Sequence, residues 1–237
     1  MRKHGPQYEQ AYVPIFEYLI DPTKITFEDD ILANIKNFIK KTGAVSDTLF
    51  QVLPHMEKVF TKNKNCFGDV LMDTLNLYMI YGKERIMSEP GAIEMLLRIA
   101  DAAMFTTEPS ITVNNSEGAI FLAIIFQIFQ GTECLNQHFE NALNRVAERM
   151  QAQCKPTLKK HLLQVFLAAL YYNASATLKY LEQKQLTKLV IVELTKCKKS
   201  FKSTYEQKSF VIGITSILTV YDAPDTIKDP GTVSRLL

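Results

Sequence analysis

Apolar side chains recur along most of this chain with the spacing of an α-helix, and short breaks separate the segments that carry the pattern. For example, Ile31, Ile35, Phe38 and Ile39 follow the i, i+4, i+7, i+8 order that places apolar groups on one helix face. The 237 residues include only nine Gly and nine Pro. An all-β chain of this length needs a turn about every 8–12 residues and usually more of both. The pattern therefore predicts an all-α protein.

The breaks divide the chain into a series of predicted helices, and the end of a further helix is expected within residues 1–20. The predicted helices cover residues 27–42, 46–60, 66–82, 90–105, 115–130, 134–153, 157–172, 174–182, 184–202 and 205–221. Residues 222–237 contain two Pro and one Gly, so we expect a loop there.

Residues that prefer helix ends support several of these boundaries. Gly43 suits the C-terminal end of the helix over residues 27–42, and Ser46 suits the start of the next one. Asn114 and Glu117 resemble a capping box, which predicts a helix start at that point. Pro156 marks another start, because proline lacks the N–H group that a helix interior uses.

Two residues that disfavour helices lie inside predicted ones. Pro54 has no N–H group for the carbonyl of Phe50, so it should bend its helix. Gly213 costs its helix about 1 kcal/mol relative to Ala. A glycine in such a position usually has a packing reason, so we expect a neighbouring helix to approach closely there.

The spacing of the helices indicates a repeat architecture. The first helices of successive pairs begin near residues 27, 66, 115, 157 and 205, which is an average period of about 45 residues. This period lies within the range of HEAT and armadillo units and above the roughly 34 residues of tetratricopeptide repeats. We therefore predict a HEAT-repeat α-α superhelix over residues 1–237, a single solenoid segment of about five antiparallel helix pairs.

Motifs for catalysis, cofactor binding or metal binding are absent from the sequence. None of the four histidines belongs to H-E-x-x-H, and no G-x-S-x-G, G-x-x-x-x-G-K or G-x-G-x-x-G occurs. Cys134 and His138 lie four positions apart on one helix face, but a metal site needs three or four ligands. We therefore expect no enzyme activity, no cofactor and no metal. The less favoured alternative is an α-helical enzyme whose site leaves no motif.

Cysteine spacing and apolar runs bear on the cellular compartment. The four cysteines stand far apart without a C-x-x-C pair, so we expect reduced and mostly buried thiols. No apolar stretch of the secretory type follows the basic N-terminal residues. The longest apolar run, residues 119–129, suits a buried helix but is too short to span a membrane. These features predict a cytosolic protein with no membrane association.

Charge is distributed unevenly and points to one candidate binding surface. Residues 1–120 carry 12 basic and 16 acidic side chains, whereas residues 121–237 carry 15 basic and nine acidic ones. Five lysines of the predicted helix over residues 184–202 fall within an arc about 100° wide. They are Lys184, Lys188, Lys198, Lys199 and Lys202. A solvated helix face is the simpler interpretation, and a contact strip for an acidic protein partner is the functional one. Direct nucleic-acid binding is disfavoured, because no Arg or aromatic residue is interleaved with these lysines.

Four segments of the sequence match a known pattern in the same order along the chain. One is residues 168–173, which read Ala-Ala-Leu-Tyr-Tyr-Asn at the end of a predicted helix. The others are Leu53-Pro54 followed by Val59-Phe60, the segment from Phe67 to Tyr78, and the helix over residues 208–218 with its internal glycine. These segments resemble the C-terminal HEAT-repeat region of the importin-β (karyopherin) superfamily, in the branch of importins seven and eight.

This resemblance implies a segment of a longer nuclear transport receptor that works in the cytoplasm and the nucleus. Such a receptor binds protein cargo and the Phe-Gly repeats of nucleoporins and takes part in Ran-dependent protein import. Contact with the small GTPase Ran would come through the longer receptor. The alternative is a generic HEAT-repeat scaffold or adaptor for protein–protein interaction, unrelated to nuclear transport. Binding to Ran and to Phe-Gly repeats would separate the two.

Overall fold

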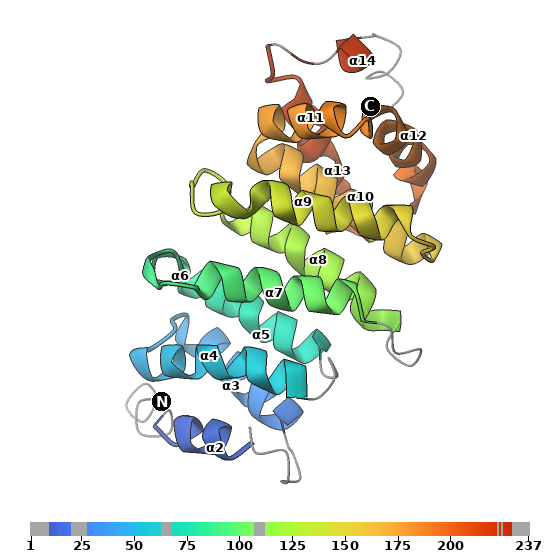
Figure 1. Cartoon of the computed structure of the whole chain (residues 1–237). Coiled ribbons are helices and arrows are strands. Elements are labelled where there is room, and N and C mark those ends of the chain that lie inside the picture. Colours follow the sequence, from blue (N-terminus) through green and yellow to red (C-terminus); the bar gives the residue numbers. More distant parts are fainter. Residues whose placement is uncertain are drawn as a thin grey trace. The chain divides into compact units, whose positions relative to one another are not determined.

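A computed structural model describes residues 10–19, 28–62, 68–106, 112–221, 223 and 225–228 of the chain (Figure 1). Every regular element in these ranges is helical, and they contain no strand. The first half holds α2 (Tyr12–Leu19), α3 (Glu28–Thr42), α4 (Asp47–Lys62), α5 (Gly68–Tyr81), α6 (Lys83–Ser88), α7 (Ala92–Met104) and α8 (Thr112–Ile128). The second half holds α9 (Asn136–Gln151), α10 (Pro156–Tyr172), α11 (Ala174–Gln183), α12 (Thr187–Cys197), a 3-10 turn (Lys198–Ser200), α13 (Thr204–Ile217) and α14 (Asp225–Lys228). The all-α prediction is therefore confirmed for the described residues.

The chain divides into two compact units, residues 1–118 and residues 119–237, with the boundary inside α8. This boundary nearly coincides with the change in charge along the sequence. Unit 1 carries the excess of acidic side chains, and unit 2 carries the excess of basic ones.

In unit 1, helices that are not consecutive in the chain pack side by side. α3 packs along α5, whereas α2 and α7 both pack against α4. Ile35, Ile39 and Met56 are fully buried in this core. Tyr78 of α5 is also fully buried, and its hydroxyl donates a hydrogen bond of 2.8 Å to the carbonyl oxygen of Leu49 in α4.

Unit 2 is centred on α10, whose residues 161–170 are all buried. α13 packs along α10, and α9, α11 and α12 also contact it. Gly213 of α13 makes the closest approach. A Cβ atom built there would lie 2.7 Å from the carbonyl oxygen and 2.8 Å from the Cβ of Leu167. Because the backbones of α10 and α13 meet at this point, the predicted close approach of a helix at Gly213 is confirmed.

Most predicted helix boundaries agree with the structure. Gly43 follows α3 with a left-handed φ of 66°, and the Oγ of Ser46 accepts a hydrogen bond from the N–H of Leu49. Pro156 is the first residue of α10, and Pro54 lies inside α4 as predicted. The prediction of a helix start at Asn114 is wrong, because α8 already begins at Thr112. A capping motif expresses only a local preference, and the chain is helical through it.

The predicted continuous helix over residues 184–202 is also wrong. α11 ends at Gln183, the chain turns with a φ of 55° at Gln185, and α12 then covers only Thr187–Cys197. After the 3-10 turn, Phe201 is buried with its ring centroid 5.4 Å from that of Phe210 in α13. This contact draws the chain away from the axis of α12. The short helices α6 and α14 were not predicted, because six and four residues carry too little periodicity, and α14 lies where the sequence indicated a loop.

None of the described helices is both long enough and apolar enough to cross a membrane.

Candidate protein-binding surfaces

The five predicted contact lysines are all exposed, but they do not share one helix. We call them the lysine segment. Lys184 is the C-cap residue of α11, and Lys188 belongs to the first turn of α12. Lys198 and Lys199 lie in the 3-10 turn, and Lys202 precedes α13. The single arc predicted for them is therefore wrong, because the chain changes direction twice between the first lysine and the last.

Several apolar residues between the lysines of the lysine segment are buried. Leu186, Val190, Leu194 and Phe201 are each at most 5% exposed, so these side chains anchor the segment to unit 2. Among the described residues, no ion pair involves Lys188, Lys199 or Lys202. The lysine segment thus exposes its cationic groups to solvent while its apolar side chains are packed against unit 2.

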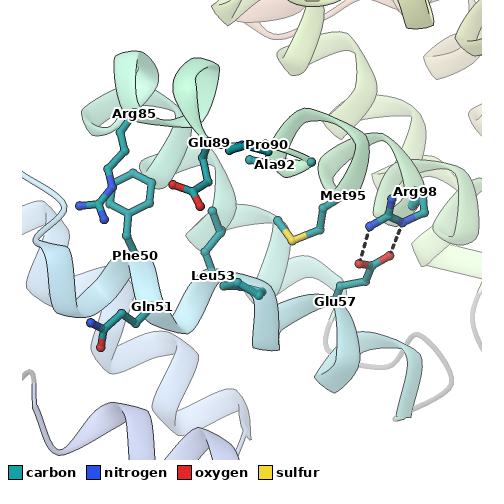
Figure 2. A pocket seen from close by; sticks show the side chains of 12 residues that line it. Phe50, Gln51, Leu53, Glu57, Arg85, Glu89, Pro90, Ala92, Met95 and Arg98 are labelled. Atoms are coloured by element: carbon teal, nitrogen blue, oxygen red, sulfur yellow. Dashed lines mark hydrogen bonds and ion pairs between the residues drawn. The ribbon is translucent and has the colours of Figure 1, made fainter.

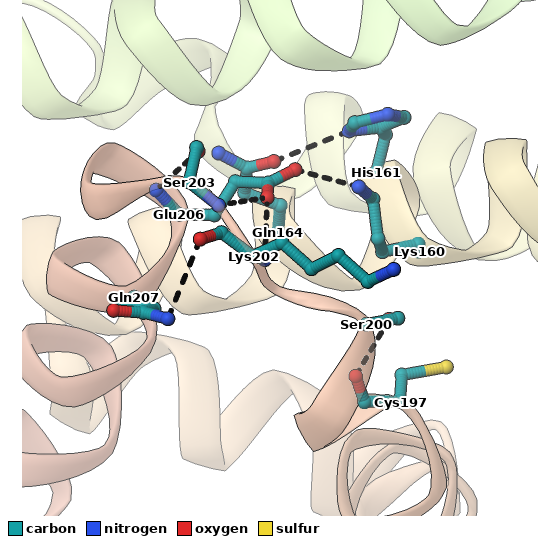
Figure 3. A network of polar contacts seen from close by, with 9 residues as sticks. All are labelled: Lys160, His161, Gln164, Cys197, Ser200, Lys202, Ser203, Glu206 and Gln207. Atoms are coloured by element: carbon teal, nitrogen blue, oxygen red, sulfur yellow. Dashed lines mark hydrogen bonds and ion pairs between the residues drawn. The ribbon is translucent and has the colours of Figure 1, made fainter.

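A polar network around Glu206 holds the C-terminal part of the lysine segment in place (Figure 3). Lys160 of α10 donates a hydrogen bond of 2.6 Å to Oε1 of Glu206. The backbone N–H groups of Lys202 and Ser203 donate to Oε2 at 2.9 and 3.1 Å. Burial alone would raise the pKa of Glu206, but these hydrogen bonds outweigh it and lower the pKa to about 2.

This network was not predicted, although the sequence contains a signal for part of it. Ser203 and Glu206 have the S-x-x-E spacing of a capping box, and both reciprocal hydrogen bonds are formed at the start of α13. The partner Lys160 lies 46 residues away, so no local pattern could have named it. The residue after Lys160 in the sequence, His161, is buried. Its Nδ1 lies 3.2 Å from Oε1 of Gln164, and burial lowers the pKa of His161.

A pocket of about 390 Å³ lies in unit 1 between α4, α6 and α7 (Figure 2). Its apolar lining includes Phe50, Leu53 and Pro54 of α4 and Met95 of α7. Glu89 follows α6 and begins a turn. The backbone N–H of Ala92 closes this turn by donating a hydrogen bond of 3.2 Å to the carbonyl oxygen of Glu89. Figure 2 shows the Glu89 carboxylate directed toward Leu53.

Two ion pairs border this pocket. The Nε and Nη2 atoms of Arg98 donate hydrogen bonds of 2.7 and 2.8 Å to the two carboxylate oxygens of Glu57. Arg85 pairs with Asp47, and its guanidinium carbon lies 4.2 Å from the centroid of the Phe50 ring. The pocket was not predicted from the sequence, because its walls come from three separate helices and only the predicted bend at Pro54 hinted at an irregular surface.

The structure shows the surroundings of the possible metal pair, Cys134 and His138, and of three of the cysteines. Within that part of the chain, no group of three or more His, Cys, Asp or Glu side chains is arranged to hold a metal ion. The Sγ of Cys134 lies 3.1 Å from the Oγ1 of Thr132, and His138 contacts Gln137. Cys134, Cys154 and Cys197 are free but only partly buried, so the expectation of mostly buried thiols is wrong for these three, and Cys66 lies outside the described residues.

Comparison with known proteins supports a distant relationship to importins. The chain is 22% identical over 227 residues to a protein from Dictyostelium discoideum named "probable importin-7 homolog". The alignment covers 93% of this chain but only 21% of that relative, so the chain spans about a fifth of the relative's length. No protein-family model and no solved structure matches the chain. The chain is therefore all-helical in its described residues and distantly similar in sequence to an importin-7 homolog.

Proposed function

We propose that this chain is a HEAT-repeat segment of an importin-like nuclear transport receptor in the branch of importins seven and eight. The observation that carries the proposal is the alignment with the importin-7 homolog over 93% of the chain. In this role the chain binds protein cargo, takes part in Ran-dependent import and works in both cytoplasm and nucleus. It is a binding protein without catalytic activity, and it contacts Ran and nucleoporin Phe-Gly repeats as part of the longer receptor.

The packing within each unit supports the HEAT-repeat part of this proposal. In a solenoid of helix pairs, the first helix of one pair packs beside the first helix of the next, and the second helices do the same. α3 beside α5 fits the first layer of unit 1, and α2, α4 and α7 fit the second. In unit 2, α10 beside α13 repeats this relation with α11 and α12 between them in the chain.

Localisation in permeabilised cells tests the transport role. A fluorescent form of the full chain should accumulate at the nuclear rim, and free Phe-Gly repeat peptide should displace it. A control protein of the same size and charge should remain diffuse. A diffuse signal for the chain, together with no measurable binding to Phe-Gly repeats or to GTP-bound Ran, would favour a generic HEAT-repeat scaffold instead.

We propose that the lysine segment is the contact surface for an acidic protein partner. Each exposed lysine contact contributes only about 0.2–1 kcal/mol, so binding should be cumulative and sensitive to salt. Changing Lys184, Lys188, Lys198 and Lys199 to Glu together should therefore weaken binding to acidic cargo proteins at low salt. Affinity is measured by fluorescence anisotropy at low and moderate salt concentrations.

A matched pair of variants provides the control. Lys40 and Lys41 form another exposed pair of adjacent lysines, at the end of α3 in unit 1. The double change of Lys198 and Lys199 to Glu alters net charge equally, so it should weaken binding more than the same change at Lys40 and Lys41. Equal effects would show that the lysine segment is an ordinary solvated surface.

A further inference from the structure

We propose that the pocket between α4, α6 and α7 is a binding site for a primary alkylammonium group, an ammonium carried by a short apolar stem. The site lies wholly within unit 1. It does not involve the lysine segment, and the inference does not depend on a role in nuclear transport. Lysine side chains and free amines both carry this chemistry.

The charges around the pocket favour a cation over an anion. Both guanidinium groups of the lining already have carboxylate partners, because Arg98 binds Glu57 and Arg85 binds Asp47. The lining and its ion-pair partners together contain four carboxylates, those of Asp47, Glu57, Glu89 and Glu94. Two guanidinium groups oppose them, so this set of paired groups is net negative, and Glu89 is the lining carboxylate that has no ion-pair partner among the described residues.

Two hydrogen-bond acceptors remain available to such a cation. In the described part of the chain, no ion pair or side-chain hydrogen bond engages the exposed carboxylate of Glu89. The second acceptor is the carbonyl of Phe50, which cannot receive the usual helical hydrogen bond from residue 54 because Pro54 has no N–H group. Phe50 and Pro54 both line the pocket, so we infer that this carbonyl, displaced by the proline ring, is within reach of a bound ammonium.

The remaining lining suits an apolar stem. Leu53 of α4 lies opposite Ala92 and Met95 of α7 in the pocket (Figure 2), and Pro54 also belongs to the lining. Long cationic side chains commonly lay their methylene groups along apolar surface while the charged end meets polar groups. Methionine adapts its shape to such a stem, because it is unbranched and its thioether is polarizable.

The same geometry disfavours other cations. Guanidinium groups bind best by stacking on an aromatic face or by a forked pair of bonds to one carboxylate. The ring of Phe50 already carries Arg85, and Glu57 already makes the forked pair with Arg98. A calcium ion needs about six to eight oxygen ligands, many more than Glu89 and one carbonyl supply. An ammonium with three rotatable donors fits the two separate acceptors.

Titration of the full chain with n-pentylamine tests the site, with 1-pentanol as the uncharged probe of the same stem. Binding is followed by NMR of ¹³C-labelled methionine methyl groups, in which the Met95 signal is assigned by its loss in Met95→Leu. We expect pentylamine to shift the Met95 signal and pentanol to bind more weakly. Equal affinities for the two probes, or no shift at Met95, would overturn the proposal.

Two variants separate the acceptors from general charge effects. Glu89→Gln should weaken pentylamine binding about three- to tenfold at low salt, because it removes the charge-assisted hydrogen bond. Glu84→Gln makes the same charge change at an exposed residue of α6 outside the pocket, so its effect should stay within about twofold. An equal loss in both variants would contradict the site.

Pro54→Ala tests the carbonyl without endangering the fold. The substitution supplies the missing N–H group, so the helix recaptures the Phe50 carbonyl and removes it from the pocket. Pentylamine binding should weaken about two- to fivefold while the thermal stability stays equal or rises. Undiminished binding in this variant would exclude the carbonyl and overturn the two-acceptor site.

Peptide arms of the same titration identify the source of the ammonium. A flexible Gly-Ser peptide with one central lysine is compared with its acetyl-lysine and arginine counterparts. Binding of the lysine peptide alone, dependent on Glu89, assigns the site to a protein partner. Binding of pentylamine without any lysine peptide assigns it to free amines. Failure of both ligands refutes the site itself.

Discussion

Gly213 offers the most direct test of how unit 2 is held together, through Gly213→Leu. The Cβ of any larger residue would lie 2.7 Å from the carbonyl oxygen of Leu167, 2.8 Å from its Cβ and 2.9 Å from its Cα. Two of these atoms belong to the backbone of α10, which is buried throughout residues 161–170, so α13 itself must move away. Overpacking of this kind costs about 1–3 kcal/mol, and we expect the upper end because backbone cannot rotate out of the way.

This loss is measured by urea denaturation and by thermal unfolding. A loss of about 3 kcal/mol should lower the Tm by roughly 6–12 °C in a chain of this size. Ile212→Leu is the control, because Ile212 is an exposed neighbour on the same helix and the change should stay within about 0.5 kcal/mol. Gly43→Ala should be milder than Gly213→Leu, about 1 kcal/mol. The cost of Gly43→Ala comes only from the left-handed φ of 66°, because the nearest atom to the added Cβ, in the side chain of Tyr81, would lie 4.0 Å away.

A second-site change sharpens the test. Leu167→Ala should not restore the stability of Gly213→Leu, because the carbonyl oxygen, Cα and Cβ of residue 167 all remain. Equal urea midpoints for the unmodified chain and Gly213→Leu would refute the packing argument. Restoration by Leu167→Ala would show that the side chain, and not the backbone of α10, sets the contact.

Two further predictions concern a partly buried carboxylate in unit 2 and a buried hydroxyl in unit 1. The hydrogen bonds from Lys160, Lys202 and Ser203 lower the pKa of Glu206 from 4.5 to about 2. The ionised Glu206 carboxylate therefore stabilises the folded chain fully above pH 4.5. This stabilisation should be lost as the pH falls from 4.5 toward 2. Glu206→Gln should flatten that part of the curve of unfolding free energy against pH. An unchanged slope in this variant would contradict the network. Tyr78→Phe should destabilise unit 1 by about 1 kcal/mol in urea denaturation, because the buried carbonyl of Leu49 loses its donor. A Tyr78→Phe chain as stable as the original would show that this hydrogen bond adds nothing to the net stability.

The sequence by itself determined where most helices lie and which faces they bury. The apolar pattern located α3, α4, α5 and α10 to within two residues at each end, because helix formation depends on local spacing and caps. Gly213 also revealed its close contact from sequence alone, since a glycine inside a helix is costly without a packing reason.

Tertiary structure alone decided what lies between helices. The lysine segment was expected on one helix, but burial of Phe201 against Phe210 redirects the chain, and no local pattern encodes that contact. The alkylammonium pocket combines Phe50, Glu89 and Met95 from segments up to 45 residues apart. A helical pattern specifies which side of each helix is buried, but not which neighbour covers it. Pockets and polar networks therefore depend on how the helices stack.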